Sequence, residues 1–309
     1  TRVTTTEGPP RSAAGALLLL VTEDPAVRES ALASLRRRGL DSELLPVPRS
    51  EVLRLRLPGL RGPRDCERLR GELAPLAGRD DVDLLLLDAA EWTPRRRLCA
   101  FDMDSTLIDC EVIDELAALA GVGDEVAAVT ARAMRGELDF RASLRARMAK
   151  LRGLPAARLE ELAATLPIMP GAERLLRRLR ELGHATVLLS GGFDLFARRL
   201  QQHLAIDEVH ANRLQLRDGA LSGELEGEIV DGARKVALLQ EVAARRGFAL
   251  ADTLAVGDGA NDLPMLAAAG LGVAFHAKPL VRQRARHTLK RAPLDALLYL
   301  LDVPHPAAP

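Results

Sequence analysis

A short apolar run that leads directly into two carboxylates constrains this chain most. Residues 98–101 (Leu-Cys-Ala-Phe) are followed by Asp102, Met103 and Asp104, and then by two hydroxyl residues. A run of this length suits a buried parallel strand, and polar residues at its end would face a crevice. Burying two acids side by side is costly unless a positive charge neutralises them, so they either bind a cation or lie solvated at the strand end. The stretch by itself leaves both interpretations open.

The overall composition disfavours several classes of protein. With 309 residues, the chain is long enough for one large domain or for two to three smaller ones. Lys and Arg together number 43, as do Asp and Glu, so no basic excess favours a nucleic-acid partner. No apolar run reaches the length of a membrane span. Three cysteines without C-x-x-C spacing (Cys66, Cys99 and Cys110) disfavour a disulfide framework or a structural zinc site and favour the reducing cytoplasm.

The chain begins with a polar segment and a small domain. Residues 1–14 lack the cationic start and apolar core of a signal peptide, so we expect a flexible tail. From 15 to 90 the pattern predicts strand, helix, strand, strand, helix and strand, the order of a ferredoxin-like α+β domain. The expected strands cover 16–21, 44–47, 52–57 and 82–87, and the expected helices cover 25–38 and 65–77, the second interrupted by Gly71 and Pro75.

This small domain resembles regulatory modules of the ACT type, in topology rather than in motif. Its first strand-to-helix turn, Thr22-Glu23-Asp24-Pro25, lacks the glycine often used by ACT modules that bind amino acids. We therefore favour a structural role, or formation of a homodimer, over effector binding. The second domain is expected to cover 91–309, beginning with a linker at 91–97 that contains three arginines.

The second domain alternates helices and strands around an all-helical insertion. Helices expected over 111–120, 125–135, 140–152 and 155–165, with no strand between them, indicate a helical cap at about 110–167. Beyond the cap, we expect strands at 185–189, 253–256 and 271–275, a hairpin at 209–216 and 220–229, and helices at 172–182, 193–203, 232–246, 262–269 and 294–301. This alternation predicts an α/β fold with a doubly wound (Rossmann-like) parallel sheet, whose ligands bind outside the C-terminal strand ends.

Three of the expected strand ends carry polar residues that would meet in one crevice. They are the segments Asp102 to Thr106, Ser190-Gly191-Gly192, and Gly257 to Asp262. Each segment alone fits an ordinary turn or a loop that leads into a helix. The third resembles a dinucleotide glycine pattern, but its last glycine position is an acid where the pyrophosphate would lie, which excludes a nucleotide site there.

Taken together, these residues have the chemistry of phosphoryl transfer. Asp102, Asp258 and Asp262 supply oxygen ligands of the kind that Mg²⁺ prefers. Ser190 offers a hydroxyl, and the two glycines after it let backbone N–H groups approach an anion. Lys235, one of only four lysines in the chain, could add a positive charge. A cation, anion-binding donors and a metal around an unhindered carboxylate are suited to phosphoryl transfer.

The order and spacing of these motifs resemble the haloacid dehalogenase superfamily. The motifs are Asp102-Met103-Asp104-Ser105-Thr106, Ser190-Gly191-Gly192-Phe193-Asp194, Lys235, and Gly257-Asp258-Gly259-Ala260-Asn261-Asp262. Within the superfamily, residues 102–111, 140–147 and the hairpin 211–228 resemble phosphoserine phosphatases. The resemblance implies that Asp102 attacks phosphorus and becomes an aspartyl-phosphate. Asp104 would protonate the leaving serine oxygen and then take a proton from water, and the two-residue spacing puts both acids on one side of an extended strand end.

The resemblance also implies how metal and substrate are held. Mg²⁺ would be bound by the Asp102 side chain, the Asp104 carbonyl and Asp258, with Asp262 in support. The phosphate would be held by Ser190, Gly191, Lys235 and Asn261. In the cap, Glu111 fits the ammonium and Arg147 the carboxylate of a free phosphoamino acid. From the residues alone, Glu111 could equally be a first-turn helix acid and Arg147 a solvated arginine.

These expectations describe an Mg²⁺-dependent enzyme that hydrolyses phosphoserine to L-serine and phosphate, the last step of serine biosynthesis. Its partner would be this small molecule, with no nucleic acid or membrane involved. A phosphotransferase, or a phosphatase for another small phosphorylated metabolite, would use the same chemistry. An amino-acid-sensing protein with an inactive phosphatase fold is disfavoured, because the acids at 102, 104, 258 and 262 are all present.

Overall fold

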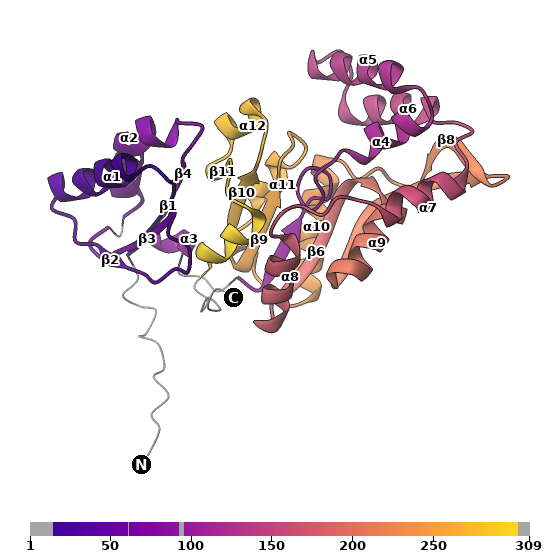
Figure 1. Cartoon of the computed structure of the whole chain (residues 1–309). Helices are drawn as coiled ribbons and strands as arrows, with labels where there is room; N and C mark the ends of the chain where they lie inside the picture. Colours follow the sequence, from indigo (N-terminus) through magenta and orange to yellow (C-terminus); the bar gives the residue numbers. More distant parts are fainter. Residues whose placement is uncertain (1–14, 61, 93–95, 302–309) are drawn as a thin grey trace. The chain divides into compact units, whose positions relative to one another are not determined.

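The computed structural model describes residues 15–60, 62–92 and 96–301, and it divides the chain into two compact units (Figure 1). Unit 1 comprises residues 1–95 and 298–309, and unit 2 comprises residues 96–297. The tail expected at 1–14 and part of the expected linker lie outside the described residues. Within the described ranges, we find no helix with the length and apolar character needed to cross a membrane.

Unit 1 contains a four-stranded antiparallel sheet, two long helices and one short helix. The strand order β2-β3-β1-β4 is that of a ferredoxin-like fold. Its elements in chain order are β1 (Ala16–Val21), α1 (Pro25–Arg37), β2 (Glu43–Leu44), β3 (Val52–Leu57), α2 (Pro63–Ala77), β4 (Asp83–Leu87) and α3 (Ala89–Trp92). Alternate leucines of β1 pack with one face of each helix in a single apolar cluster, which stabilises this small sheet.

Local signals explain most of these boundaries. The Asp24 side chain accepts a hydrogen bond from the Ala26 N–H and caps α1, with Pro25 in its first turn. The strand expected at 44–47 is wrong beyond Leu44, because Pro46 and Pro48 cannot donate to a strand ladder. Helix α2 is also continuous where we expected an interruption, because its buried face packs into the unit 1 core.

The expected linker at 91–97 needs a similar correction at its start. Glu91 and Trp92 close the short helix α3, in which the Trp92 side chain is buried. The Asp88 carboxylate accepts a hydrogen bond from the Glu91 N–H, and the Glu91 carboxylate accepts one from the Asp88 N–H. This reciprocal pair caps the helix in the manner of a capping box.

Unit 2 is built on a seven-stranded sheet with the order β11-β10-β9-β5-β6-β7-β8. All strand pairs are parallel except β7 with β8, which form the expected hairpin. The strands are β5 (Leu98–Phe101), β6 (Ala185–Phe193), β7 (Glu208–Arg217), β8 (Ala220–Glu226), β9 (Thr253–Gly257), β10 (Leu271–Phe275) and β11 (Thr288–Leu289). The hairpin turns at Asp218-Gly219, where both residues have positive φ, as a tight two-residue turn requires.

Helices pack against the strands of this sheet (Figure 1). They are α8 (Ala172–Glu181), α9 (Asp194–Leu204), α10 (Gly232–Arg245), α11 (Leu263–Ala268) and α12 (Pro279–Arg284), with the 3₁₀ segments η2 (Leu250–Asp252) and η3 (Leu294–Tyr299), the last two residues of which belong to unit 1. The last element was expected to be an α-helix over 294–301. It is a 3₁₀ segment instead, in which the Leu294 N–H bonds to the Pro170 carbonyl and the Ala296 N–H to the Pro293 carbonyl.

The cap consists of four helices inserted after β5. They are α4 (Val112–Leu119), α5 (Gly123–Met134), α6 (Phe140–Lys150) and α7 (Ala156–Ala164). Its two connections to the sheet pair with each other, because the Asp109 N–H donates to the Pro167 carbonyl and the Met169 N–H donates to the Leu107 carbonyl. A second short antiparallel bridge joins Pro155, before α7, to Ala220 of β8, and cap helices α6 and α7 also contact β8 and α9 of the core, respectively.

Candidate active site

The candidate site lies where three neighbouring parallel strands end. Strand β5 is flanked by β6 on one side and by β9 on the other, so the chain crosses the sheet in opposite directions from β5. Such a switch point opens a crevice at the carboxyl ends of the strands. Asp102 directly follows β5, and its N–H bonds to the Val256 carbonyl of β9. Asp258 directly follows β9.

A buried lysine joins two of the carboxylates. Lys235, on α10, is 0% exposed, and its Nζ lies 2.7 Å from Asp102 Oδ1 and 2.6 Å from Asp262 Oδ1. Burial disfavours the charged form of Lys235, but the two carboxylates outweigh it and raise the lysine pKa above its usual value. The lysine therefore stays charged and neutralises part of this acidic cluster.

The negative charge that Lys235 leaves uncompensated is suited to bind a cation. Oxygens of Asp102, Asp258 and Asp262 all lie within 4.8 Å of one another, and all three side chains are buried. Burial and the charge of Asp262 raise the pKa of Asp258 to about 7, and the same two causes raise that of Asp102. One lysine cannot compensate three clustered acids, and carboxylate oxygens are the ligands that hard divalent cations prefer. The donor set thus fits a metal such as Mg²⁺.

Asp262 differs from the other two acids in its hydrogen bonds. Its Oδ1 faces Lys235, and its Oδ2 accepts a hydrogen bond from the Gly259 N–H at 2.9 Å. Both of its oxygens are therefore engaged by protein donors. Asp102 and Asp258 have more freedom to bind a cation directly, while Asp262 is suited to hold the lysine and the loop after β9.

Asp104 has one engaged oxygen and one that faces the site. Its Oδ1 accepts a hydrogen bond from the Val112 N–H, at the start of cap helix α4, at 2.9 Å. Its Oδ2 would lie 2.6 Å from a Cβ placed on Gly192, so this oxygen points toward the end of β6. Desolvation, followed by the charge of Glu111, raises the pKa of Asp104 to about 7. A carboxyl group in this range can both give and take a proton near neutral pH.

The turn after β5 is tight and partly strained. The Met103 carbonyl accepts hydrogen bonds from three successive N–H groups, those of residues 106, 107 and 108. Ser105 has a positive φ of 53°, which is uncommon for a residue with a side chain. Its hydroxyl donates to Glu111 Oε1 at 3.0 Å, which connects the turn to the beginning of the cap.

The residues expected to hold an anion gather at the end of β6. Strand β6 continues through Ser190, Gly191 and Gly192, which we had placed after the strand. The Gly192 N–H donates to Ser190 Oγ at 2.8 Å, which leaves the hydroxyl hydrogen of Ser190 available for another acceptor. A Cβ at position 191 would lie 2.8 Å from the Phe140 ring, so a side chain there would displace Phe140, and Asn261 Nδ2 lies 3.6 Å from the same point.

The two cap residues expected at the site lie on its cap side. Glu111 precedes α4, and Arg147 is on α6. Burial lowers the pKa of Arg147, while the charges of Asp114, Glu111 and Asp104 oppose this shift. Among the described residues, Arg147 Nε has no hydrogen-bond partner. A half-buried guanidinium whose Nε is buried and free to donate, close to site acids, is suited to bind an anionic ligand.

Two features of this region were missed from the sequence. Asn212, on β7, is buried and bonds to the backbone of Gly191. Arg141, on cap helix α6, forms an ion pair with Asp231, which caps core helix α10, with Nε and Oδ2 2.5 Å apart. Asparagine is depleted in strands, so Asn212 in an expected strand was a usable signal. The Arg141 contact joins positions 90 residues apart and had no local signal.

Comparisons with known proteins agree with this geometry. The family model described as haloacid dehalogenase-like hydrolase matches residues 99–267, over half of the chain. A phosphoserine phosphatase of Streptomyces coelicolor is 50% identical over 240 residues, which cover 77% of this chain and 58% of that protein.

Two solved structures extend the comparison. A HAD family hydrolase of Salmonella enterica serovar Typhi aligns with a TM-score of 0.81 and 31% identity, over 94% of this chain and 99% of that one. A phospho-aspartyl intermediate analogue of phosphoserine phosphatase aligns with a TM-score of 0.64 and 39% identity, over 67% of this chain and 100% of that one. The matched family, the sheet order and the cluster of acids after β5 and β9 lead to one assignment: the chain belongs to the haloacid dehalogenase-like hydrolases.

Proposed function

We propose that this chain is an Mg²⁺-dependent phosphoserine phosphatase that releases L-serine and phosphate through an aspartyl-phosphate on Asp102. The observation that carries the proposal is the pairing of two unequal acids at one strand end. Asp102 Oδ1 lies 2.7 Å from the buried Lys235 ammonium, whose charge opposes the rise in pKa that burial gives Asp102. Asp104 Oδ1 instead accepts the Val112 N–H, and the pKa of Asp104 is raised to about 7. The names of the relatives support phosphoserine as the substrate, although the chain spans only 58% of the Streptomyces enzyme.

The proposed nucleophile is Asp102 Oδ2. The Lys235 ammonium lies against Oδ1 and favours the charged form of the carboxylate, so the second oxygen can attack phosphorus. The bond from phosphorus to the serine oxygen breaks as the bond to Asp102 forms. Water then attacks phosphorus, which releases phosphate and regenerates the Asp102 carboxylate.

Asp104 is the proposed general acid and base. Because its Oδ1 accepts the Val112 N–H, the transferable proton resides on Oδ2, the oxygen that faces Gly192. That proton goes to the departing serine oxygen in the first step. The resulting carboxylate takes a proton from the attacking water in the second step, so that the site returns to its starting state.

The metal would be held by the Asp102 and Asp258 carboxylates and the Asp104 carbonyl, with Asp262 in support. When bound, Mg²⁺ supplies positive charge that offsets the phosphoryl oxygens. The protein groups proposed to hold the phosphate are the Ser190 hydroxyl, the Gly191 N–H, the Lys235 ammonium and the Asn261 amide.

Substrate selection is assigned to the cap. We infer that the Glu111 carboxylate binds the ammonium of phosphoserine and that the Arg147 guanidinium binds its carboxylate. The Ser105 hydroxyl holds Glu111 at 3.0 Å, and the free Nε of Arg147 offers a donor. Closing the cap over the crevice would also exclude bulk water during phosphoryl transfer.

The small unit is proposed to be an ACT-like module that forms a homodimer. Its edge strand β2 ends at Leu44, whose side chain is 66% exposed, and such an edge can pair with a second copy. Analytical ultracentrifugation of the full chain tests this, and a dimer that becomes monomeric in Leu44→Lys is the expected result. The three free cysteines support the cytoplasm as the compartment.

A phosphate-release screen tests the proposed activity. Phosphoserine, phosphothreonine and sugar phosphates are compared with and without Mg²⁺, and the highest kcat/KM is expected for phosphoserine with Mg²⁺. Higher values for a sugar phosphate would favour another small metabolite as the substrate. Transfer of phosphate to an added hydroxyl amino acid, in preference to water, would indicate a phosphotransferase.

A further inference from the structure

Asn212 is a buried polar side chain that joins two segments of the proposed phosphate site. We propose that it is a positioning residue, whose amide group orients the Ser190-Gly191-Gly192 segment relative to helix α10. This inference rests on the proposed function, because it concerns how the phosphate is held. The chain contains only two asparagines, and the other, Asn261, is already assigned to the phosphate.

The first observation is an irregularity in the sheet at this point. Leu189 pairs with His210, and the next pair is Phe193 with Asn212, so four steps along β6 match two steps along β7. The three residues of β6 between these pairs are therefore displaced from the regular ladder. Bulges of this kind redirect backbone groups and are frequent beside active sites.

The second observation is that the Asn212 side chain bonds to backbone groups where the strand ladder is interrupted. Its Nδ2 donates to the Gly191 carbonyl at 2.7 Å, and its Oδ1 accepts the Val230 N–H at 2.8 Å. The two partners fix the positions of the amide oxygen and nitrogen of Asn212, because a carbonyl needs a donor and an N–H needs an acceptor. Asn212 is 1% exposed, so water cannot replace these bonds if they are lost.

The third observation is that the two partners of the Asn212 amide, Gly191 and Val230, lie beside residues of the proposed phosphate site. Gly191 follows Ser190 and borders Asn261, while Val230 precedes Asp231, the N-cap of α10. The Lys235 N–H bonds to the Asp231 carbonyl, so Lys235 lies one helical turn from this cap. One side chain thus connects the strand that carries the proposed phosphate donors to the helix that carries the buried lysine.

These contacts predict an effect on phosphate affinity in addition to stability. Without the amide, the Gly191 carbonyl and the Val230 N–H would have to find other partners, and the displaced segment of β6 would move. A shift of about 1 Å in a positioning segment can cost on the order of a hundredfold in function. We therefore expect Asn212→Ala to bind inorganic phosphate at least tenfold more weakly.

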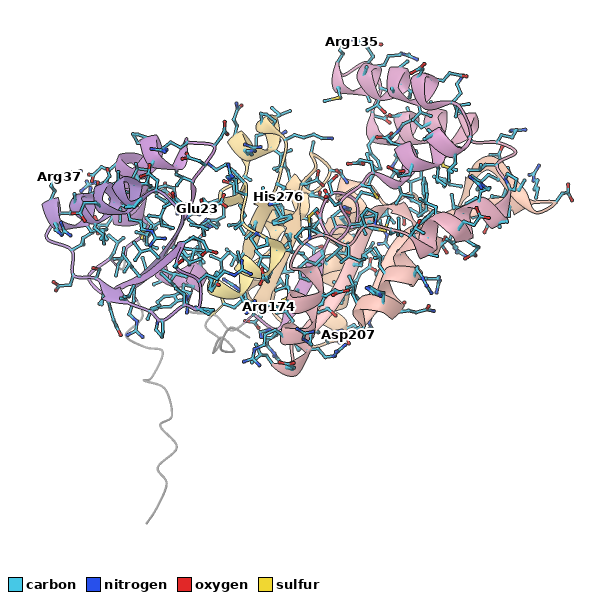
Figure 2. All side chains as sticks on the ribbon, in the orientation of Figure 1. Glu23, Arg37, Arg135, Arg174, Asp207 and His276 are labelled. Atoms are coloured by element: carbon cyan, nitrogen blue, oxygen red, sulfur yellow. The ribbon has the colours of Figure 1, made fainter. Side chains whose placement is uncertain are left out.

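The experiment is calorimetric titration of the full chain with inorganic phosphate in Mg²⁺ buffer, together with urea unfolding. Thr186→Val is the matched control, because Thr186 is also buried and its hydroxyl makes two hydrogen bonds, both with Asp207. Thr186 is the second residue of β6, near the opposite end of the strand from Ser190-Gly191-Gly192, so this control lies away from the proposed phosphate donors; its partner Asp207 is labelled in Figure 2. Thr186→Val should lower the unfolding midpoint and leave the phosphate Kd unchanged.

Asn212→Asp distinguishes the loss of one hydrogen bond from a general loss of packing. The aspartate keeps an acceptor for Val230 but can donate to Gly191 only when protonated. Its phosphate Kd, relative to the unchanged chain at the same pH, should therefore recover as the pH falls, whereas that of Asn212→Ala should not.

Equal phosphate affinity in Asn212→Ala and the unchanged chain would overturn the inference, even if the variant is less stable. So would a loss of affinity in Thr186→Val as large as that in Asn212→Ala. Failure of the unchanged chain to bind phosphate would instead contradict the proposed function, and the inference with it.

Discussion

The buried position of Lys235 makes a strong prediction about stability. Lys235→Met removes a cation whose Nζ lies 2.7 Å from Asp102 Oδ1 and 2.6 Å from Asp262 Oδ1. At an effective dielectric constant of about 20, each contact corresponds to about 6 kcal/mol of Coulomb attraction. Desolvation of the three ions offsets much of this gain, but removing one partner leaves buried charge uncompensated, which costs about 3–5 kcal/mol. We expect Lys235→Met to lose this much unfolding free energy at pH 8.

Urea unfolding of metal-free protein measures this loss, and Lys150→Met is its matched control. Lys150 Nζ lies 2.6 Å from Glu125 Oε2, but the two side chains are 45% and 55% exposed. The same substitution there should cost about 0–1 kcal/mol. Similar losses in both variants, or a loss below about 1 kcal/mol in Lys235→Met, would refute the argument from burial.

The pH dependence of the deficit provides a second check. Without the lysine, the pKa values of the clustered acids rise further in the folded state. A raised folded pKa favours the folded protein below that pKa, and the advantage is lost as the pH rises through it. The deficit of Lys235→Met should therefore shrink from pH 8 to pH 5. A deficit that does not change with pH would mean that lost packing, and not charge, destabilises the variant.

Three further predictions follow from the same site. Asp102→Asn should abolish turnover of phosphoserine while the circular dichroism spectrum and unfolding midpoint stay close to those of the unchanged chain; residual turnover within tenfold would contradict its role as nucleophile. Burial and Asp262 raise the pKa of Asp258 to about 7 in the folded chain, so the metal-free protein should lose stability as the pH rises from 5 to 8. Asp258→Asn should reduce that loss, as measured by urea midpoints. Arg141→Ala breaks the ion pair between the cap and Asp231, so the KM for phosphoserine should rise severalfold. Because Arg141 is 43% exposed, the unfolding free energy should change by less than about 1 kcal/mol. An unchanged KM would show that the pair does not help to close the cap.

The elements that the sequence predicted best are those whose burial is uniform. Strands β1 and β10 occupy the predicted ranges, because each is a short apolar run that lies inside a sheet. The errors occur where local signals compete with packing. Pro46 and Pro48 shortened β2, and packing kept α2 continuous through Gly71 and Pro75.

The site shows the same division between local and long-range information. The acids could be found from their motifs, and the structure brings Asp102, Asp258 and Asp262 within 4.8 Å. The inclusion of Ser190-Gly191-Gly192 in β6 could not be predicted, because it depends on the bulge that ends at Asn212. The Arg141 contact with Asp231 depends on how the cap packs against the core, which no local sequence pattern predicts.

The most direct test of the account is to trap the covalent intermediate. The chain is mixed with phosphoserine and Mg²⁺, quenched in acid and treated with borohydride, which reduces an acyl phosphate to an alcohol. Peptide mass spectrometry is then expected to find homoserine in place of aspartate at position 102, and only when phosphoserine was present. Conversion at another carboxylate, or rapid turnover with no conversion at Asp102, would contradict the assignment of Asp102 as the nucleophile.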